Sequence, residues 1–515
     1  MVSKADLDAL YCYTRRVGTF ILTDSSPALE GRTIPPATYI RLAQLHNLDT
    51  PLFPSLKHLR IVDASSSLTH LTLLLSNSLR SIDFGNFDRT QEEMLLSFLI
   101  TLVDECPELS SIKLISPILK PVWTTCLKFD HLRTLELNVT YLKFELFSDI
   151  GQAFPQLEHF VLDARTAKYL RATTPPDFRR DDNIAELHSQ ISPSERGSTS
   201  AELSEFHADG RDYPGFEPTP QYEPMSVSVE SSRPAFLRLE KLHITGSLDL
   251  IQDLVKSIPS RCLEETALTL VRSKRPKFPK KEKRVFSGPL VRIDLETPDF
   301  ATCLDNVFSN WRRTLTSISI GQHEDYSPSD QGDIRAPVYP TLPVPLCEKI
   351  LMLPELERLD ISGWTIENFL KRPSLLDPIC SNLKFLHLPI QSNSKGVPFS
   401  TLDLIAELFP KLVSFQSSIV TLDVADIPVS NPLKAIPRGL SHGLEILSVG
   451  NTSPNPNPKE VLDIARHIFA LFPNLQEIRT HEGQNKDQWD YIHSLVQVFQ
   501  GVCLDHAARS LDLST

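Results

Sequence analysis

The chain has 515 residues, a formal net charge of −12 and a pI near 5.7, which disfavours a protein that binds nucleic acid or anionic membranes along its length. Hydrophobic residues make up 41%, and 40 prolines against 18 glycines exclude collagen-like and Gly-rich disordered classes. The apolar runs are far shorter than the roughly 18 residues of a membrane span, and the N-terminus lacks the apolar core of a signal peptide. We therefore expect a cytoplasmic or nuclear protein with no nucleic-acid partner and no membrane partner.

Residues 1–50 are predicted to form a helical lead-in, with helical stretches at "SKADLDALYCYTRRV" and "ATYIRLAQLHNL". Residues 51–170 are predicted to form a first repeat block, because a motif of the form apolar-Pro-x-Leu-x-x-Leu-x-Ile recurs there about every 23–30 residues. Full and weaker copies along the whole chain include FPSLKHLRI (53–61), SNSLRSIDF (76–84), CPELSSIKL (106–114), FDHLRTLEL (129–137), FPQLEHFVL (154–162), FLRLEKLHI (236–244), WRRTLTSISI (311–320), LPELERLDI (353–361), CSNLKFLHL (380–388), FPKLVSFQS (409–417), SHGLEILSV (441–449) and FPNLQEIRT (472–480).

The spacing within each copy predicts a short strand that follows a helix. The last two apolar positions are two residues apart, so they share one face of a strand, and the proline ends the helical stretch before it. One unit cannot bury both its helix stripe and its strand face, but a stack of units can. The octet "LPELERLD" (353–360) by itself is spelled like the start of an F-box, yet its many siblings with strand spacing indicate a strand start instead.

The composition changes at 171–235, which is rich in Ser, Pro, Glu and Asp, carries no repeat and is predicted to be a disordered insertion. Residues 236–515 are predicted to form a second repeat block that ends in a C-terminal capping helix, with Trp489, Ile492, Val496 and Phe499 near one face. The predicted fold class is α/β: an irregular, horseshoe-like leucine-rich-repeat solenoid with parallel strands on the concave face and helices on the convex face.

The residues that flank the middle leucine of each strand are predicted to point away from the core, toward the concave face. Solenoids use such a surface to bind proteins. The alternative reading of each residue is that it is polar because it faces water. An exposed aromatic side chain such as Phe385 suits a contact anchor. The candidate protein-binding residues are His58, Arg60, Asp83, Glu136, His243, Arg358, Asp360, Phe385, His387 and Arg479.

No nucleotide-binding, hydrolase or zinc-protease motif occurs, so we expect no enzyme, no catalytic residue, no cofactor and no metal. The eight cysteines are scattered, which suits free thiols in a reducing compartment. The basic run "RSKRPKFPKKEKR" (272–284) is either a nuclear import signal or phosphate-contacting patch, or a solvated loop that balances an acidic chain.

The set FPSLKHLRI, CPELSSIKL, FDHLRTLEL and LPELERLDI, with proline-terminated helices between its members, resembles fungal F-box proteins with irregular leucine-rich repeats. The lead-in "LDALYCYTRRVGTFIL" is similar to the segment that follows the F-box in that group. The resemblance implies the substrate-recognition part of an F-box-type ubiquitin ligase subunit, with a target protein on the concave face. We expect the chain to be a monomer. No F-box is found in this sequence, so a Skp-type adaptor is expected as a partner only if an F-box is encoded upstream. The alternatives are a repeat-only interaction scaffold unconnected to ubiquitination and, third, an enzyme with an unrecognised site.

Overall fold

The computed structural model describes residues 4–23, 36–45, 51–63, 68–87, 89–143, 145–165, 168–170, 236–258, 261–272, 296–324, 340–366, 381–390, 396–420, 442–450, 458–481 and 486–512. The predicted insertion (171–235) and all but the first residue of the basic run (272–284) lie outside these ranges. The ranges 1–170 and 234–515 belong to one compact unit. The two predicted repeat blocks therefore join within that unit.

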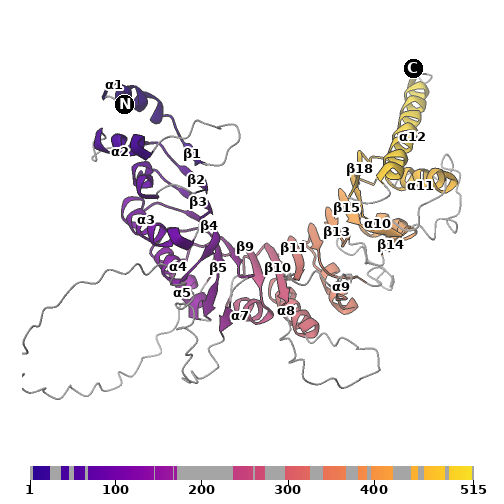
Figure 1. Ribbon diagram of the computed structural model, residues 1–515. Coiled ribbons are helices and arrows are strands. Elements are labelled where there is room, and N and C mark those ends of the chain that lie inside the picture. Colours follow the sequence, from indigo (N-terminus) through magenta and orange to yellow (C-terminus); the bar gives the residue numbers. More distant parts are fainter. Residues whose placement is uncertain are drawn as a thin grey trace, which may run out of the picture. The chain divides into compact units, whose positions relative to one another are not determined.

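The centre of the fold is a 14-stranded sheet in which each strand pairs in parallel with its neighbours (Figure 1). Its strands, in pairing order, are β1 (Thr19–Leu22), β2 (His58–Asp63), β3 (Ser81–Asn86), β4 (Ser111–Ile118), β5 (Thr134–Val139), β7 (His159–Asp163), β9 (Lys241–Gly246), β10 (Glu265–Arg272), β11 (Ser317–Glu324), β12 (Arg358–Ile361), β13 (Phe385–His387), β15 (Ser414–Ser417), β17 (Ile446–Val449) and β18 (Glu477–Thr480). Two further pairs stand apart from this sheet, β6 (Tyr141–Lys143) with β8 (Lys168–Leu170) and β14 (Val397–Pro398) with β16 (Ile419–Val420).

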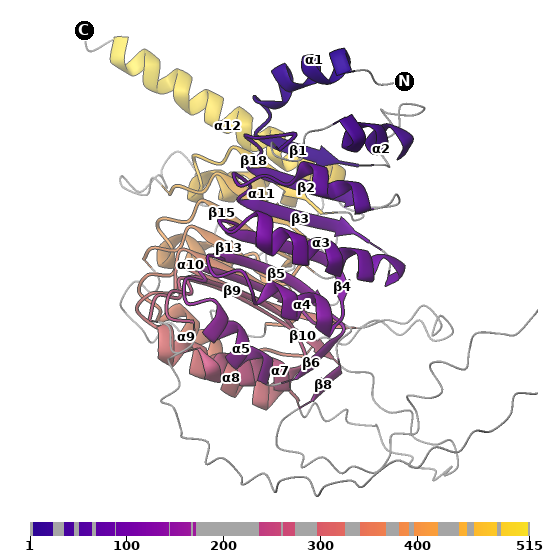
Figure 2. The ribbon, with the colours of Figure 1, turned by 90° about the vertical axis from the view of Figure 1, so that its left-hand side faces the viewer.

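Helices follow most strands and lie along one face of the sheet (Figures 1 and 2). They are α1 (Lys4–Thr14), α2 (Pro36–Leu45), α3 (Glu92–Glu105), α4 (Lys120–Cys126), α5 (Glu145–Ala153), α7 (Leu248–Ser257), α8 (Glu296–Trp311), α9 (Val344–Leu351), α10 (Thr401–Leu408), α11 (Pro458–Leu471) and α12 (Lys486–Asp512), with the short 3₁₀ turns η2 (Leu68–Leu74) and η3 (Arg89–Gln91). The α/β class predicted from the sequence is thereby confirmed, with a parallel sheet and helices on one of its faces.

The repeated motif builds each unit in the same way. Helix α3 ends one residue before Cys106, and Pro107 then prevents the helix from continuing. Two successive backbone amides at the start of a strand then share one carbonyl of the preceding unit, as those of Arg80 and Ser81 share the carbonyl of Lys57. The leucines and isoleucines of the motif point to the helices and are almost completely buried, and together they form one continuous core along the sheet.

Two strands of the sheet were not predicted. Strand β1 lies within the predicted helical lead-in, where "TFIL" lacks the repeat motif but pairs with β2 and packs Phe20 against Phe53, with ring centroids 5.2 Å apart. Strand β10 was missed because Thr266 stands where the other units have an apolar residue. Thr266 is buried all the same, at the register position of Leu242 and Ile318. Pairing with neighbouring strands, rather than the local pattern, determines both strands.

Candidate functional site

The face of the sheet opposite the helices, called the helix-free face below, is the candidate functional site. Along β3, β5, β7 and β9 buried residues alternate with partly exposed ones, so the two faces of the sheet differ in burial. Two rows of register partners cross the helix-free face from strand to strand. The first row contains His58, Ser81, Ser111, Thr134, His159, Lys241, Glu265, Ser317, Arg358, Phe385, Ser414, Ile446 and Glu477. The second row contains Arg60, Asp83, Lys113, Glu136, Val161, His243, Ala267, Ser319, Asp360, His387, Gln416, Ser448 and Arg479.

The structure places all ten predicted site residues in these two rows. It brings most of them together in pairs on adjacent strands. The Nε atom of Arg60 lies 3.4 Å from a carboxylate oxygen of Asp83, and the Nδ1 atom of His387 lies 3.6 Å from one of Asp360. His58 is exposed. Arg479 bonds within its own strand, since its Nη2 atom lies 2.8 Å from a carboxylate oxygen of Glu477.

Lysine and arginine side chains are as numerous in the two rows as aspartate and glutamate side chains. The basic members are Arg60, Lys113, Lys241, Arg358 and Arg479, and the acidic members are Asp83, Glu136, Glu265, Asp360 and Glu477. Lys113 and Glu136 form a further cross-strand pair at 3.3 Å. Because the charges cancel locally, the helix-free face presents no field of one sign to a partner, as a nucleic-acid site would.

Glu265 contacts two side chains of the neighbouring strand, and it was missed because β10 was missed. Its carboxylate lies 3.0 Å from Nε2 of His243 and 3.3 Å from Nζ of Lys241. Burial by itself would raise the pKa of Glu265, but the hydrogen bonds and positive charges of His243 and Lys241 together lower it below its ordinary value. Glu265 therefore stays ionised at neutral pH and holds both neighbouring side chains in place.

Phe385 differs from the exposed anchor that was expected from the sequence. It is only partly exposed, and the guanidinium carbon of Arg358 lies over its ring, 4.8 Å from the centroid. This distance is in the range of a cation–π interaction. The aromatic face of Phe385 is therefore engaged within the protein, and the two predicted site residues form one composite surface.

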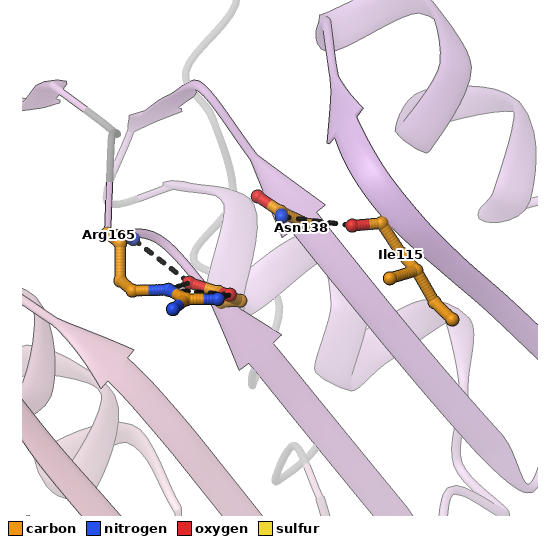
Figure 3. Close-up of polar contacts among 4 residues, drawn as sticks. Ile115, Asn138 and Arg165 are labelled. Atoms are coloured by element: carbon orange, nitrogen blue, oxygen red, sulfur yellow. Dashed lines mark hydrogen bonds and ion pairs between the residues drawn. The ribbon is translucent and has the colours of Figure 1, made fainter. Parts of the chain in front are cut away.

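A better candidate for an apolar anchor is Ile115, which sequence reasoning missed. The pairing of β4 with β5 shifts register between Leu114 and Pro117, so Ile115 belongs to a β-bulge, and it stays 43% exposed. The side-chain amide of Asn138 donates a hydrogen bond to the carbonyl of Ile115 at 3.0 Å (Figure 3). On the side toward β3, the hydroxyl of Ser116 accepts a hydrogen bond from the backbone amide of Phe87 at 2.9 Å. Ile115 continues the alternation of β4 on the face of Lys113, and bulges are common beside functional sites.

Polar groups continue beyond Asn138 onto β7, the strand on the other side of β5 from Ile115. Asp163 is the register partner of Asn138, and its carboxylate accepts two hydrogen bonds from Nε and one from Nη2 of Arg165 (Figure 3). The hydrogen bonds from Arg165 to Asp163 raise the pKa of the guanidinium above its ordinary value. Ile115, Asn138, Asp163 and Arg165 are called the Ile115 patch below. An apolar centre with a polar border is the usual anatomy of a protein-binding hot spot.

Four of the described cysteines are buried free thiols. Burial raises the pKa of the Cys106 thiol to about 11, and it raises those of Cys126, Cys303 and Cys347 to about 12, so these thiols stay protonated. Among the described residues no three His, Cys, Asp or Glu side chains are grouped to hold a metal ion.

A scan against models of known protein families finds no match for this chain. No curated protein matches it either. In the part of the chain that the structure describes, every helix is too short or too polar to cross a membrane.

Proposed function

We propose that this protein is a non-enzymatic binding module that holds a target protein against the helix-free face of its sheet. The observation that carries this proposal is the bulge-presented Ile115, an exposed apolar side chain bordered by hydrogen-bonded polar groups on a face that the helices leave uncovered. The local cancellation of charge across the two rows favours a protein partner over a nucleic acid. A sheet of this length offers room for an extended or folded partner.

We infer further that the units are irregular leucine-rich repeats. The motif places its apolar residues in the core and its polar residues on the helix-free face, which is the arrangement that this repeat class uses. The sequence resemblance then favours substrate recognition for an F-box-type ubiquitin ligase as the biological role. Binding to a Skp-type adaptor is expected only from a chain that also carries an F-box, and a repeat scaffold without a ligase is the alternative.

Cross-linking mass spectrometry on the protein captured from cells with a lysine-reactive reagent tests the location of the target. Lys113 and Lys241 lie on the helix-free face, and Lys349 lies on helix α9. All three have side chains 41–53% exposed and form one surface ion pair each, so they are matched in reactivity. We expect cross-links from Lys113 or Lys241 to the target. Cross-links that involve Lys349 and omit both others would contradict the proposed face.

A separate capture experiment distinguishes the ligase from the scaffold. If an F-box is encoded upstream, a Skp-type adaptor that co-purifies with the chain extended to include it supports the ligase role. Targets that are captured by the extended chain without any adaptor support the repeat scaffold instead.

A further inference from the structure

The 14-stranded sheet has two edges, β1 and β18, and they differ in what covers them (Figure 1). Helix α12 packs against β18 and buries Trp489 and Ile492. It also satisfies backbone groups that precede β18, because Nε2 of Gln500 donates hydrogen bonds to the carbonyls of Pro473 and Leu475 at 2.9 and 2.8 Å. Among the described residues, no strand pairs with the outer side of β1. One end of the stack is therefore capped and the other is an open sheet edge.

The backbone at the open edge repeats a pattern that occurs throughout the sheet. At every junction between neighbouring strands, two successive amides of one unit donate hydrogen bonds to a single carbonyl of the preceding unit, at 2.8–3.1 Å. At β2 the amides of Lys57 and His58 share the carbonyl of Gly18 in this way. Because Thr19 is the register partner of His58, the amides of Gly18 and Thr19 are the corresponding pair of the first unit. In the described part of the chain, no carbonyl accepts a hydrogen bond from these two amides.

The rest of the outer edge is equally suited to pair with a strand. Since the carbonyl of Gly18 faces β2, the alternation of a strand directs the N–H and C=O groups of Thr19 and Ile21 away from β2. Natural sheets usually protect such an edge with a charged residue or a proline, and the segment "TFIL" has neither. The side chain of Ile21 is 57% exposed.

The core side chains of β1 also lack a neighbour on this side. Phe20 and Leu22 pack against the core but stay partly exposed, whereas Leu59 and Ile61, their register partners in β2, are 1% exposed. Strand β2 has a neighbour on both sides, and β1 has one only. A further strand beside β1 would cover Phe20 and Leu22 as β1 covers the side chains of β2.

We propose that the outer edge of β1 binds an extended segment of a partner protein, which adds to the sheet as a parallel strand. The direction follows from the paired amides of Gly18 and Thr19, which receive one carbonyl from a parallel strand at every other junction. The segment carries apolar residues at alternate positions, because those on the helix side meet Phe20 and Leu22. This site is separate from the target on the helix-free face.

A second copy of this chain fits the edge less well than a separate partner. Its own β18 edge is covered by α12, so the sheet of one copy does not continue into that of another through β18. Two β1 strands related by a twofold axis would pair antiparallel, unlike every pair in this sheet.

Random peptides of about nine residues, long enough for one strand, are the probe. They are displayed on phage and selected on the full chain. We expect the selected peptides to alternate apolar and polar residues. Residue-level hydrogen exchange should then show that a bound peptide slows the amides of Gly18, Thr19 and Ile21, while those of Phe20 and Leu22, which face β2, change little. A selection without binders, or peptides that protect only amides elsewhere, would overturn the proposal.

Proline variants test the outward amides one at a time. Ile21→Pro and Thr19→Pro each remove a donor that β2 does not use, as edge positions tolerate, and each should raise the dissociation constant of the peptides at least about ten-fold. Ile21→Val keeps the amide and is the matched control, and unchanged exchange of the β2 amides confirms that β1 stays paired. Ile115→Arg should leave peptide binding unchanged, which separates this site from the helix-free face.

Other occupants of the edge give different results. Proline variants that both bind the peptides like the wild type would overturn the strand addition. Self-association of the chain that Ile21→Pro abolishes would assign the edge to a second copy. A chain extended by its upstream coding sequence that no longer binds the peptides would assign it to the protein's own residues. Either of these last two results would overturn the separate partner.

Discussion

The guanidinium group of Arg358 lies over the ring of Phe385 on the adjacent strand, 4.8 Å from its centroid. The two residues are register partners in β12 and β13, so the pleat of the sheet places both side chains on the helix-free face. The pair joins a charge to an aromatic surface without burying either of them completely. This relationship explains why a partly exposed phenylalanine is tolerated between polar neighbours.

Replacing Phe385 by Leu should therefore lower the free energy of unfolding by about 0.5–1 kcal/mol, because the apolar bulk remains but the π face is lost. Phe385→Tyr keeps that face and should stay close to the wild type. Urea titrations of the three proteins measure the difference. Equal stability of the Leu and Tyr variants would show that Arg358 gains nothing from the ring.

Substitutions on the core side of β12 should lower the free energy of unfolding much more. Leu359 is completely buried, and its truncation to Ala leaves a cavity that should cost about 2–5 kcal/mol. Glu357→Ala removes only a surface ion pair with Lys384, 2.7 Å long, and should cost less than about 1 kcal/mol. Hydrogen exchange of the β12 amides reports both effects locally. Similar losses in the two variants would mean that the strand register is wrong.

Gly363, just after β12, is required by the backbone. Its φ is +70°, and a Cβ added there would lie 2.3 Å from the carbonyl oxygen of Gln322. Gly363→Ala should therefore destabilise the protein by at least about 1–3 kcal/mol. Gly18→Ala is the control, because nothing lies within 4 Å of its added Cβ and its change should stay within about 1 kcal/mol. Thermal unfolding of both variants decides the matter, and a Gly363→Ala protein as stable as the control would refute the clash.

His442 should make the region around β17 sensitive to acid. Its Nε2 lies 2.9 Å from the carbonyl oxygen of Phe409, and its Nδ1 accepts a hydrogen bond from the amide of Leu444 at 3.1 Å. Both nitrogens of the neutral ring therefore have a hydrogen-bond partner. Burial lowers the pKa of His442 below its ordinary 6.5, and the bond to Phe409 only partly offsets this. As pH falls below about 6.5, the unfolded chain binds the proton first, so stability is lost toward acid and recovered toward neutral pH.

The substitution His442→Gln tests this dependence, because glutamine keeps a donor and an acceptor but does not titrate. Hydrogen exchange of β17 should accelerate between pH 7 and 5.5, about the range in which histidine titrates, more in the wild type than in the variant after correction for intrinsic exchange. If both proteins show the same loss, other groups are responsible.

The strands could be predicted where the repeat motif is present, and they could not be predicted where pairing with neighbouring strands determines the structure. The spacing of Leu356, Leu359 and Ile361 was sufficient to place one strand face in the core. Thr266 concealed β10, because a hydroxyl at an apolar position breaks the pattern although the neighbouring strands still bury it. Ile115 follows Lys113 by two residues in a strand whose alternation continues to Ile118, so its exposure was predictable, but the repeat motif ends at Leu114 and β4 continues beyond it.

For the candidate site, the sequence predicted the face on which residues lie but not their contacts. Strand alternation predicted which face Arg60 and Asp83 occupy, and the structure adds that they bond to each other. Glu265, the partner of His243, lies on β10, so this contact was missed together with that strand. Phe385 was predicted as an exposed anchor, but the cation above its ring could be found only once β12 and β13 were paired.

The central claim is that a target protein binds the helix-free face through the Ile115 patch, and a matched pair of variants tests it most directly. Ile115 on that face and Ile100 on helix α3 are 43% and 47% exposed, so Ile115→Arg and Ile100→Arg make the same chemical change at comparable exposure on different faces. The amounts of co-purified target are compared by quantitative mass spectrometry, with equal thermal stability as the requirement for both variants. We predict that Ile115→Arg lowers target recovery at least about ten-fold, as for a hot-spot anchor, while Ile100→Arg leaves it within about two-fold of the wild type. Unchanged recovery with Ile115→Arg, or an equal loss with Ile100→Arg, would contradict the claim.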